Sequence, residues 1–245
     1  MTASPRPSAT VVLARDTDDA PEFLFVRRRA GDAFGNAYTF PGGVLDDDEF
    51  EARGFCAGLT DEQASALLGL DEGGLDYFSA VVRELYEETG VLPGAPDTVD
   101  AGCREQLYRG ELKWTDFLRQ HDLSIPAGSL YYFTHWITPA DLAKRWSTRF
   151  FLAAMPEGQE VVPDGSEITD YCWLSARAAL DSASSGERKI PFPTRKTVET
   201  LAGHDTVDEL LDWARQKQAD GVPALQPEIR YEDGEARIFL PDVYE

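Results

Sequence analysis

The chain has 245 residues, of which 42% are hydrophobic and 11% aromatic, so it can bury a sizeable core and is not an intrinsically disordered chain. Its 23 Lys and Arg against 44 Asp and Glu give a formal net charge of −21. This acidity argues against nonspecific binding to nucleic-acid polymers or to anionic membranes, because both require a basic face.

Strands are predicted along the first part of the chain. A polar turn that contains Pro21 joins the first two strands as a hairpin, and a Gly-Gly turn ends the third. The predicted strands cover residues 8–14, 22–28 and 37–44.

An acidic segment of mixed helical character separates these strands from a strong helix. Residues 46–76 contain ten acidic residues and one basic residue, Arg53. Residues 75–89 follow with apolar side chains at helical spacing. Gly90 stands where a left-handed C-terminal cap is expected, so we predict that the helix ends there.

The second half of the chain mixes strands and helices without a regular βαβ repeat. This order favours an α+β protein, folded as an α/β/α sandwich with a mixed sheet. Residues 107–121 are predicted to be helical or irregular, and the C-terminal tail to form a hairpin around Asp233-Gly234. Strands are predicted at 129–138, 149–156 and 168–175, and helices at 176–183, 194–203 and 207–218.

Three carboxylates share one face of the predicted 75–89 helix. Glu84, Glu87 and Glu88 are three and four residues apart, so their side chains converge beside the apolar stripe. Like charges repel, and a hard divalent cation would relieve that repulsion, because Mg²⁺ couples carboxylate oxygens to substrate phosphates. For three glutamates alone, a solvated acidic helix face is the competing interpretation.

The residues around these carboxylates reproduce a known signature. Residues 83–91, RELYEETGV, match the pattern R-E-U-x-E-E-x-G-U, in which U is aliphatic, at every specified position. Gly43 and Glu49 have the spacing of the G-x5-E that opens the signature, and the turn Phe40-Pro41-Gly42-Gly43 precedes it. On these motifs the chain resembles the Nudix hydrolase superfamily.

The chain departs from that signature in the spacing of its two parts. Residues Phe50–Val82 separate Glu49 from Arg83 where the signature has only seven residues, which leaves open whether Glu49 takes the place of the first glutamate. The inserted segment, together with residues 149–175 and 191–202, resembles the branch that includes peroxisomal acyl-CoA diphosphatases.

The resemblance implies that water hydrolyses a diphosphate with the help of Mg²⁺ or Mn²⁺ ions. Glu84, Glu87 and Glu88 would bind the metal, together with the backbone carbonyl of Gly43. Arg83 would orient the carboxylates rather than contact the substrate.

The general base is a separate question, because different branches of the superfamily take it from the signature or from a later loop. Glu84 and Glu167 are the two candidates, and Glu160 is a weaker one. An ordinary surface acid is the competing interpretation for Glu167.

Two basic clusters are candidates for phosphate contacts, because a guanidinium binds phosphate oxygens in a forked geometry. In the first cluster, strand alternation would place the middle arginine on the opposite face from its neighbours. Solvated surface charge is the competing interpretation for both clusters. The candidates are Arg27, Arg28 and Arg29 at the end of the second strand, and Arg195 and Lys196 beside Arg188 and Lys189.

The resemblance predicts a pyrophosphohydrolase whose preferred substrate is CoA or an acyl-CoA, cut to 3′,5′-ADP and (acyl-)phosphopantetheine. One alternative is a hydrolase of ADP-ribose, dinucleotides or nucleotide sugars. Another is a non-catalytic Nudix-fold nucleotide-binding or regulatory module, which need not keep three metal-binding carboxylates together.

We expect one Nudix domain over residues 1–245, with an insertion at about 50–75 and a helical C-terminal extension at about 190–245. The partner is a small-molecule substrate rather than a nucleic-acid polymer or a membrane, and a homodimer is left open. Three scattered cysteines suggest reduced thiols, and neither a secretory-type segment nor an apolar run that could span a bilayer is visible, so a cytoplasmic location is expected.

Overall fold

A mixed β-sheet forms the centre of the protein in the computed structural model, which describes residues 4–31, 35–95, 99, 101–232 and 235–241. The strand order is β3-β2-β1-β6-β5-β8, with β4 paired to β1 and β7 paired to β2. The β1–β6 and β5–β8 pairs are parallel and the others antiparallel. The strands are β1 Arg6–Arg15, β2 Glu22–Arg28, β3 Tyr38–Thr39, β4 Gly42–Val44, β5 Tyr131–Ile137, β6 Trp146–Ala154, β7 Ile168–Ser175 and β8 Ala224–Leu225.

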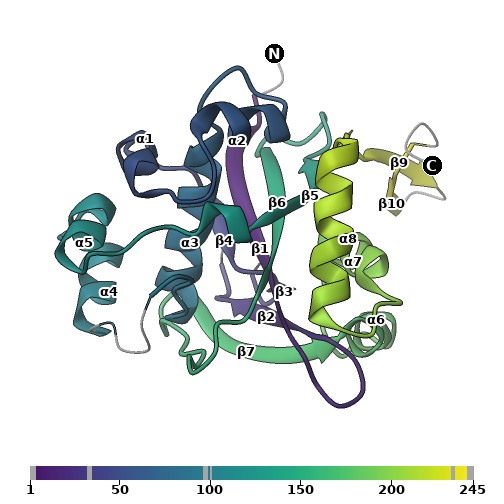
Figure 1. Ribbon diagram of the computed structural model, residues 1–245. Helices are drawn as coiled ribbons and strands as arrows, with labels where there is room; N and C mark the ends of the chain where they lie inside the picture. Colours follow the sequence, from purple (N-terminus) through teal and green to yellow (C-terminus); the bar gives the residue numbers. More distant parts are fainter. Residues whose placement is uncertain (1–3, 32–34, 96–98, 100, 233–234, 242–245) are drawn as a thin grey trace.

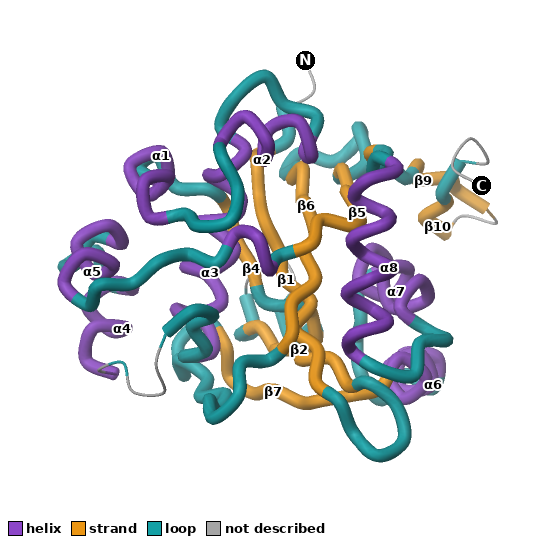
Figure 2. The backbone as a smooth tube through the Cα atoms, in the orientation of Figure 1, coloured by secondary structure: helices purple, strands orange, loops and turns teal. Residues whose placement is uncertain are grey.

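Helices cover both faces of this sheet, and Figures 1 and 2 show them on either side of the strands. The apolar side chains accordingly form two cores, one on each face. One face is covered by α1 Glu49–Ala52, α2 Asp61–Leu68, α3 Gly74–Thr89, α4 Ala101–Tyr108 and α5 Trp114–Gln120, and the other by α6 Ala176–Ser184, α7 Phe192–Leu201 and α8 Val207–Asp220. The predicted α/β/α sandwich with a mixed sheet is confirmed.

The helix α3 forms where the apolar spacing predicts it. Phe78, Val81, Val82 and Leu85 are all buried against the sheet. Gly90 ends the helix with φ of 74°, and its amide donates to the Tyr86 carbonyl at 2.8 Å. Only glycine adopts this left-handed conformation at little cost, which explains the residue at this position.

The segment between Glu49 and α3 is folded rather than extended. It consists of α1, a 3₁₀ turn at Arg53–Phe55 and α2, whose first turn is closed by a capping box between Thr60 and Gln63. Asp61 then accepts hydrogen bonds from the amides of Gly73 and Leu75, both at 3.0 Å, at the start of α3.

A bidentate ion pair connects the two ends of the segment between Glu49 and α3. Arg53 donates to Asp76 through Nε at 2.5 Å and Nη2 at 2.8 Å, so the end of α1 is tied to the first turn of α3. Gly74 packs so closely on the Ser65 backbone that a Cβ there would overlap it. The folded segment is therefore held against the first turn of α3 before the chain enters that helix.

The C-terminal part is less purely helical than expected. Besides α7 and α8 it contributes β8 to the main sheet and a separate antiparallel pair, β9 Glu228–Glu232 with β10 Glu235–Phe239. These two strands agree with the predicted hairpin, whose turn at Asp233-Gly234 lies outside the described residues. None of the helices in the described ranges combines the length and apolarity that crossing a bilayer requires.

Candidate active site

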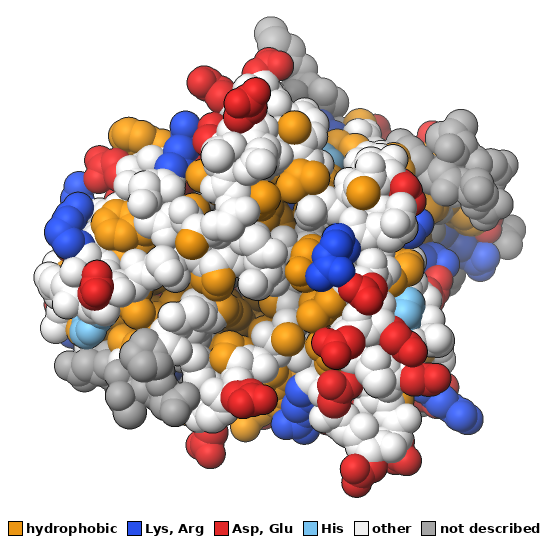
Figure 3. Space-filling view, in the orientation of Figure 1, with side chains coloured by type: hydrophobic (Ala, Val, Ile, Leu, Met, Phe, Trp, Pro, Cys, Tyr) orange, Lys and Arg blue, Asp and Glu red, His pale blue; other side chains and the backbone are white. Residues whose placement is uncertain are grey.

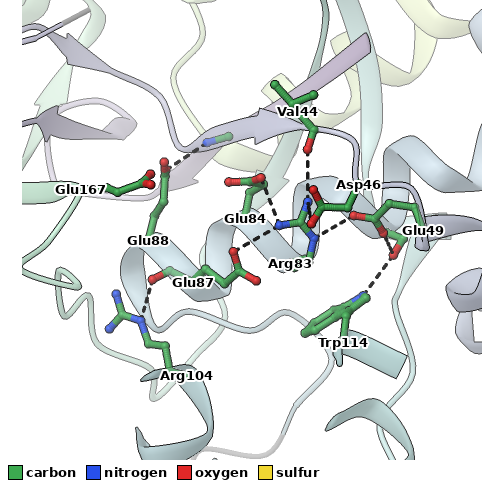
Figure 4. Close-up of polar contacts among 12 residues, drawn as sticks. Val44, Asp46, Glu49, Arg83, Glu84, Glu87, Glu88, Arg104, Trp114 and Glu167 are labelled. Atoms are coloured by element: carbon green, nitrogen blue, oxygen red, sulfur yellow. Dashed lines mark hydrogen bonds and ion pairs between the residues drawn. The ribbon is translucent and has the colours of Figure 1, made fainter. Parts of the chain in front are cut away.

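The side chains of the signature glutamates project from the side of α3 that faces the Gly42–Gly43 turn. Figure 4 shows Glu84, Glu87 and Glu88 on one helix, with Glu167 approaching from the loop before β7. Glu88 is only 2% exposed, and the side chains of Glu84 and Glu87 are 15% and 18% exposed. The helix therefore presents three largely buried carboxylates to one turn.

Arg83 connects the two parts of the signature. It is 5% exposed, and its Nε lies 2.8 Å from a Glu49 carboxylate oxygen. Its Nη1 lies 3.1 Å from Glu84 and 3.2 Å from Glu87, and its Nη2 donates to the Val44 carbonyl at 3.2 Å. Arg83 thus fixes the orientation of two signature carboxylates from behind.

Glu49 lies beside Arg83 despite the insertion that separates the two residues in the sequence. It is 2% exposed, and it also accepts a hydrogen bond from the Ser79 hydroxyl. The indole of Trp114 donates to the same hydroxyl at 3.1 Å. Burial raises the pKa of Glu49 to about 7, although Arg83 favours its charged form.

Arg28 lies beside Glu88. Its Nη2 is 2.7 Å from one Glu88 oxygen and donates to the Gly42 carbonyl at 2.5 Å, while the Gly42 amide donates to the other Glu88 oxygen at 3.1 Å. The attraction of Glu88 raises the pKa of Arg28. The pairing of β2 with β7 shifts register between Arg27 and Arg28. Strand alternation alone did not predict the ion pair between Arg28 and Glu88.

Glu167 lies at the edge of the same cluster. Its carboxylate is 3.9 Å from Nη1 of Arg28, and its side chain is 48% exposed. The loop that carries it is shaped by Asp164, whose Oδ1 accepts hydrogen bonds from the amides of residues 166–168 at 2.6–3.0 Å. The competing candidate Glu160 is exposed.

Arg104, which the sequence did not single out, connects this loop to the end of α3. Its Nε donates to the Glu87 carbonyl at 2.8 Å, and its Nη1 to the Val162 carbonyl at 2.5 Å. Two amides of the same loop complete the connection, because Val162 donates to the Thr89 carbonyl and Asp164 to the Glu88 carbonyl. An isolated arginine on a weak helix gives no sequence signal for this role.

The other predicted phosphate contacts lie apart from the carboxylates or are already engaged. Arg27 donates to Thr169 at 3.2 Å, and Arg29 is exposed. On α7, Lys196 lies 2.7 Å from Glu199, while Arg195 lies 6.0 Å from the Phe192 ring centre. Figure 3 shows acidic side chains gathered over the lower right of the visible surface, where α6 and α8 lie.

The carboxylates outnumber the cations that contact them. Burial raises the pKa of Glu87 to about 7 and of Glu88 to about 8, and it raises that of Glu84 too. Each shift reflects the cost of a buried charge that Arg28 and Arg83 only partly offset. The group comprises six carboxylates, Asp46, Glu49, Glu84, Glu87, Glu88 and Glu167, against the guanidinium groups Arg28 and Arg83.

This donor set fits a hard divalent cation, which binds carboxylate and carbonyl oxygens. A Cβ on Gly43 would overlap the Glu84 carboxylate, so the glycine is what allows that carboxylate to lie against the turn. Among the described residues no three His, Cys, Asp or Glu side chains are gathered around one point. In the structure Arg28 contacts Glu88, and Arg83 contacts Glu84 and Glu87.

A cavity of about 670 Å³ begins at this cluster. Arg28, Glu167, Gly42 and Gly43 line it where it meets the carboxylates. Its other walls are mainly apolar and come from the opposite face of the sheet and from the first turn of α7. A cavity of this size suits a small organic ligand.

Known proteins resemble this chain in sequence. Human acyl-coenzyme A diphosphatase NUDT19 is 29% identical over an alignment of 167 positions that covers 60% of this chain and 44% of that protein. The Xenopus laevis protein of the same name is 21% identical over an alignment of 264 positions that covers 89% of this chain and 70% of that protein. A Caenorhabditis elegans relative is 28% identical over 79% of this chain and 59% of its own length. The chain spans about half the length of the human and nematode relatives.

A solved structure and a family model agree with these relatives. The crystal structure of a NUDIX hydrolase from Alicyclobacillus acidocaldarius superposes with a TM-score of 0.73 at 24% identity, covering 85% of this chain and 96% of that one. At this identity the likeness concerns the fold. The model of the NUDIX domain matches residues 69–192, about half of the chain, which include α3 with all of its glutamates. The chain belongs to the NUDIX domain family.

Proposed function

We propose that this protein is a divalent-metal-dependent pyrophosphohydrolase that cleaves the diphosphate of CoA or an acyl-CoA to 3′,5′-ADP and (acyl-)phosphopantetheine. The observation that carries the reaction type is the group of buried carboxylates on α3, which exceeds the cations around it. A buried excess of negative charge is costly for folding, so its presence at the mouth of a cavity favours a functional role.

Each residue has a role in this proposal. Glu84, Glu87 and Glu88 would hold Mg²⁺ or Mn²⁺ with the Gly43 carbonyl, and Arg83 would keep the first two carboxylates in position. When bound, the metal neutralises phosphate charge and lowers the pKa of the attacking water.

The remaining steps belong to side chains at the cavity edge. The water oxygen attacks one phosphorus, the P–O bond to the other phosphate breaks, and a carboxylate accepts the water proton. Glu167 suits this role because it is partly exposed and lines the cavity, and Glu84 is the second candidate. Arg28 also lines the cavity, so its guanidinium is placed to contact the diphosphate.

Two observations support CoA compounds as the substrate. The human and frog relatives carry the name acyl-coenzyme A diphosphatase. The cavity beside the carboxylates is mostly apolar, which suits a substrate with an apolar half more than a sugar nucleotide.

The test is product release from a panel of CoA, acyl-CoAs, ADP-ribose, diadenosine polyphosphates and nucleotide sugars, with Mg²⁺ or Mn²⁺ and with EDTA as control. Metal-dependent formation of 3′,5′-ADP from CoA compounds, at least about tenfold above the other substrates in kcat/KM, is the expected result. Preferential turnover of another substrate would contradict the CoA assignment and leave the reaction type standing. No metal-dependent turnover of any member would contradict the reaction type for these substrates.

A further inference from the structure

The cavity beside the carboxylates is a trough that runs across the sheet, perpendicular to the strands. The strand register places Val44, Ser8, Thr148 and Trp136 in one row across β4, β1, β6 and β5, and all four line the cavity. Figure 1 shows these strands side by side. Three strand spacings of about 4.8 Å make the row roughly 14 Å long.

The trough and the carboxylates meet across two glycines. On the side of α3, Glu84 lies against Gly43 and Glu88 binds the Gly42 amide. On the other side, both glycines line the trough. Because neither residue has a side chain, only the β4 backbone lies between the trough and these carboxylates at this point. Arg28 and Glu167 line the trough and also belong to the carboxylate cluster, so a ligand held at their edge of the cluster can extend along the trough.

The far end of the trough has a rigid apolar wall. Trp136 and Phe192 meet edge to face, with their ring centres 6.0 Å apart. Pro191 and Pro193, which flank Phe192 in the sequence, also line the trough. The indole N–H of Trp136 donates to Thr197 at 3.1 Å, so its polar end is satisfied within the protein. The ring is left to offer an apolar surface to a ligand.

Some polar side chains on the floor of the trough already have hydrogen-bond partners within the protein. The hydroxyls of Ser8 and Thr148 bond to each other at 2.6 Å. The Thr39 hydroxyl, which lies toward the Gly42–Gly43 end, is a buried oxygen without a hydrogen-bond partner among the described residues. A ligand with a hydrogen-bonding group near the diphosphate and an apolar group farther away would match this distribution.

Few positively charged side chains line the trough. Arg28 is bound to Glu88, and Lys144 lies in the exposed loop between β5 and β6. Leu142 of the same loop is 42% exposed, so the trough opens to solvent beside it. A nucleotide with an additional phosphate would lack a buried cation here, whereas an uncharged chain would not need one.

We infer that the trough receives the pantetheine–acyl half of the substrate, with the acyl chain lying between the Trp136–Phe192 wall and the opening at Leu142. The 3′-phosphorylated nucleotide half then lies outside the trough. This inference rests on the proposed function and deepens it, because it assigns one half of the substrate to a defined surface.

The experiment measures kcat/KM for CoA and for acyl-CoAs of increasing chain length in the wild type and in Leu142→Asp. Burial of added methylenes should raise the wild-type value with chain length, by about tenfold or more between CoA and a medium-chain acyl-CoA. Leu142→Asp should remove most of that gain, because a charged side chain at the opening disfavours burial of the added methylenes. Tyr108→Asp, at a residue of α4 that is 47% exposed, is the matched control and should preserve the gain.

A second variant and three possible outcomes make the test decisive. Phe192→Ala removes part of the apolar wall and should reduce the chain-length gain without depending on the folding of Leu142→Asp. If CoA is hydrolysed but both variants follow the wild type at every chain length, the trough assignment is overturned and the proposed function stands. It is also overturned if Leu142→Asp weakens inhibition by 3′,5′-ADP instead. If the wild type cleaves no CoA compound, both proposals fall.

Discussion

The buried carboxylates near the two ends of α3 have different surroundings. Toward its beginning, Glu49 meets Ser79 and Arg83, and Trp114 completes the set from α5. Toward its end, three carboxylates, Glu84, Glu87 and Glu88, share the two guanidinium groups of Arg28 and Arg83. One end is closed by the protein itself, and the other is left with uncompensated negative charge.

This difference separates a structural carboxylate from a functional one. A buried charge that finds its partners within the fold stabilises a particular arrangement, and removing one partner is costly for stability. A buried charge in excess lowers stability unless a ligand offsets it, so it is retained where a ligand binds. The comparison predicts that substitutions at the two ends affect different quantities.

The largest expected effect is on turnover at the end with excess charge. Glu87→Gln or Glu88→Gln should lower kcat by about 10³-fold or more, because each removes a metal-binding charge while keeping the shape of the side chain. Urea unfolding of the same proteins should show a stability within about 1 kcal/mol of the wild type. Near-wild-type turnover in either variant would break the comparison and the metal-site proposal together.

The next effect is on stability at the closed end. Glu49→Ala should reduce the free energy of unfolding by about 3 kcal/mol, because it removes one buried partner of the Arg83 guanidinium and the acceptor of the buried Ser79 hydroxyl. Turnover per folded molecule should fall much less than in Glu87→Gln. Equal losses of activity in the two variants, at equal folded fraction, would show that the ends are not distinct.

Arg104 offers a way to sharpen the comparison, because it supports the functional end without entering it. Arg104→Gln should lower kcat by about tenfold through misplacement of the loop that carries Glu167, with a smaller change in KM. Amide hydrogen exchange at Val162 and Asp164 should become faster in the variant. Unchanged exchange with reduced kcat would mean that Arg104 does not act through the loop.

The smallest effect concerns the ion pair that closes the insertion. A double-mutant cycle with Arg53→Gln and Asp76→Asn should give a coupling energy of about 1 kcal/mol, since the pair is bidentate but partly exposed. Metal-dependent turnover should stay within about twofold of the wild type in both variants. A large loss of activity would place the insertion within the functional end rather than beside it.

Sequence periodicity predicted most of the fold because each pattern has one structural solution. The helix expected at 75–89 is α3 at Gly74–Thr89, and the strand expected at 22–28 is β2 with the same bounds. The strand expected at 37–44 is instead two short ones, β3 and β4, which are separated at Phe40-Pro41. Proline lacks the amide that a continuous ladder requires, so the chain breaks there.

The site was predictable only in its local part. Glu84, Glu87 and Glu88 could be grouped because helical spacing fixes their relative positions. The contacts of Arg28 with Glu88 and of Arg104 with Val162 join residues about sixty positions apart, and no periodicity links them. The metal-binding roles predicted for Glu84, Glu87 and Glu88 stay predictions, because geometry alone does not test them. The same holds for the roles predicted for Arg83, Gly43 and Glu167 and for the basic residues Arg27, Arg28, Arg29, Arg195 and Lys196.

The folded insertion between Glu49 and Arg83 has a consequence for how such chains are recognised. Since the two residues meet at 2.8 Å across the folded segment between them, the motif in this chain is a pattern in space rather than a fixed spacing along the sequence. Lengthening a closed loop is entropically inexpensive, at about 0.6 kcal/mol for each doubling. A search that demands fixed spacing would therefore overlook proteins whose motif is complete but interrupted, and a new surface can be added at this point while the carboxylates stay in place.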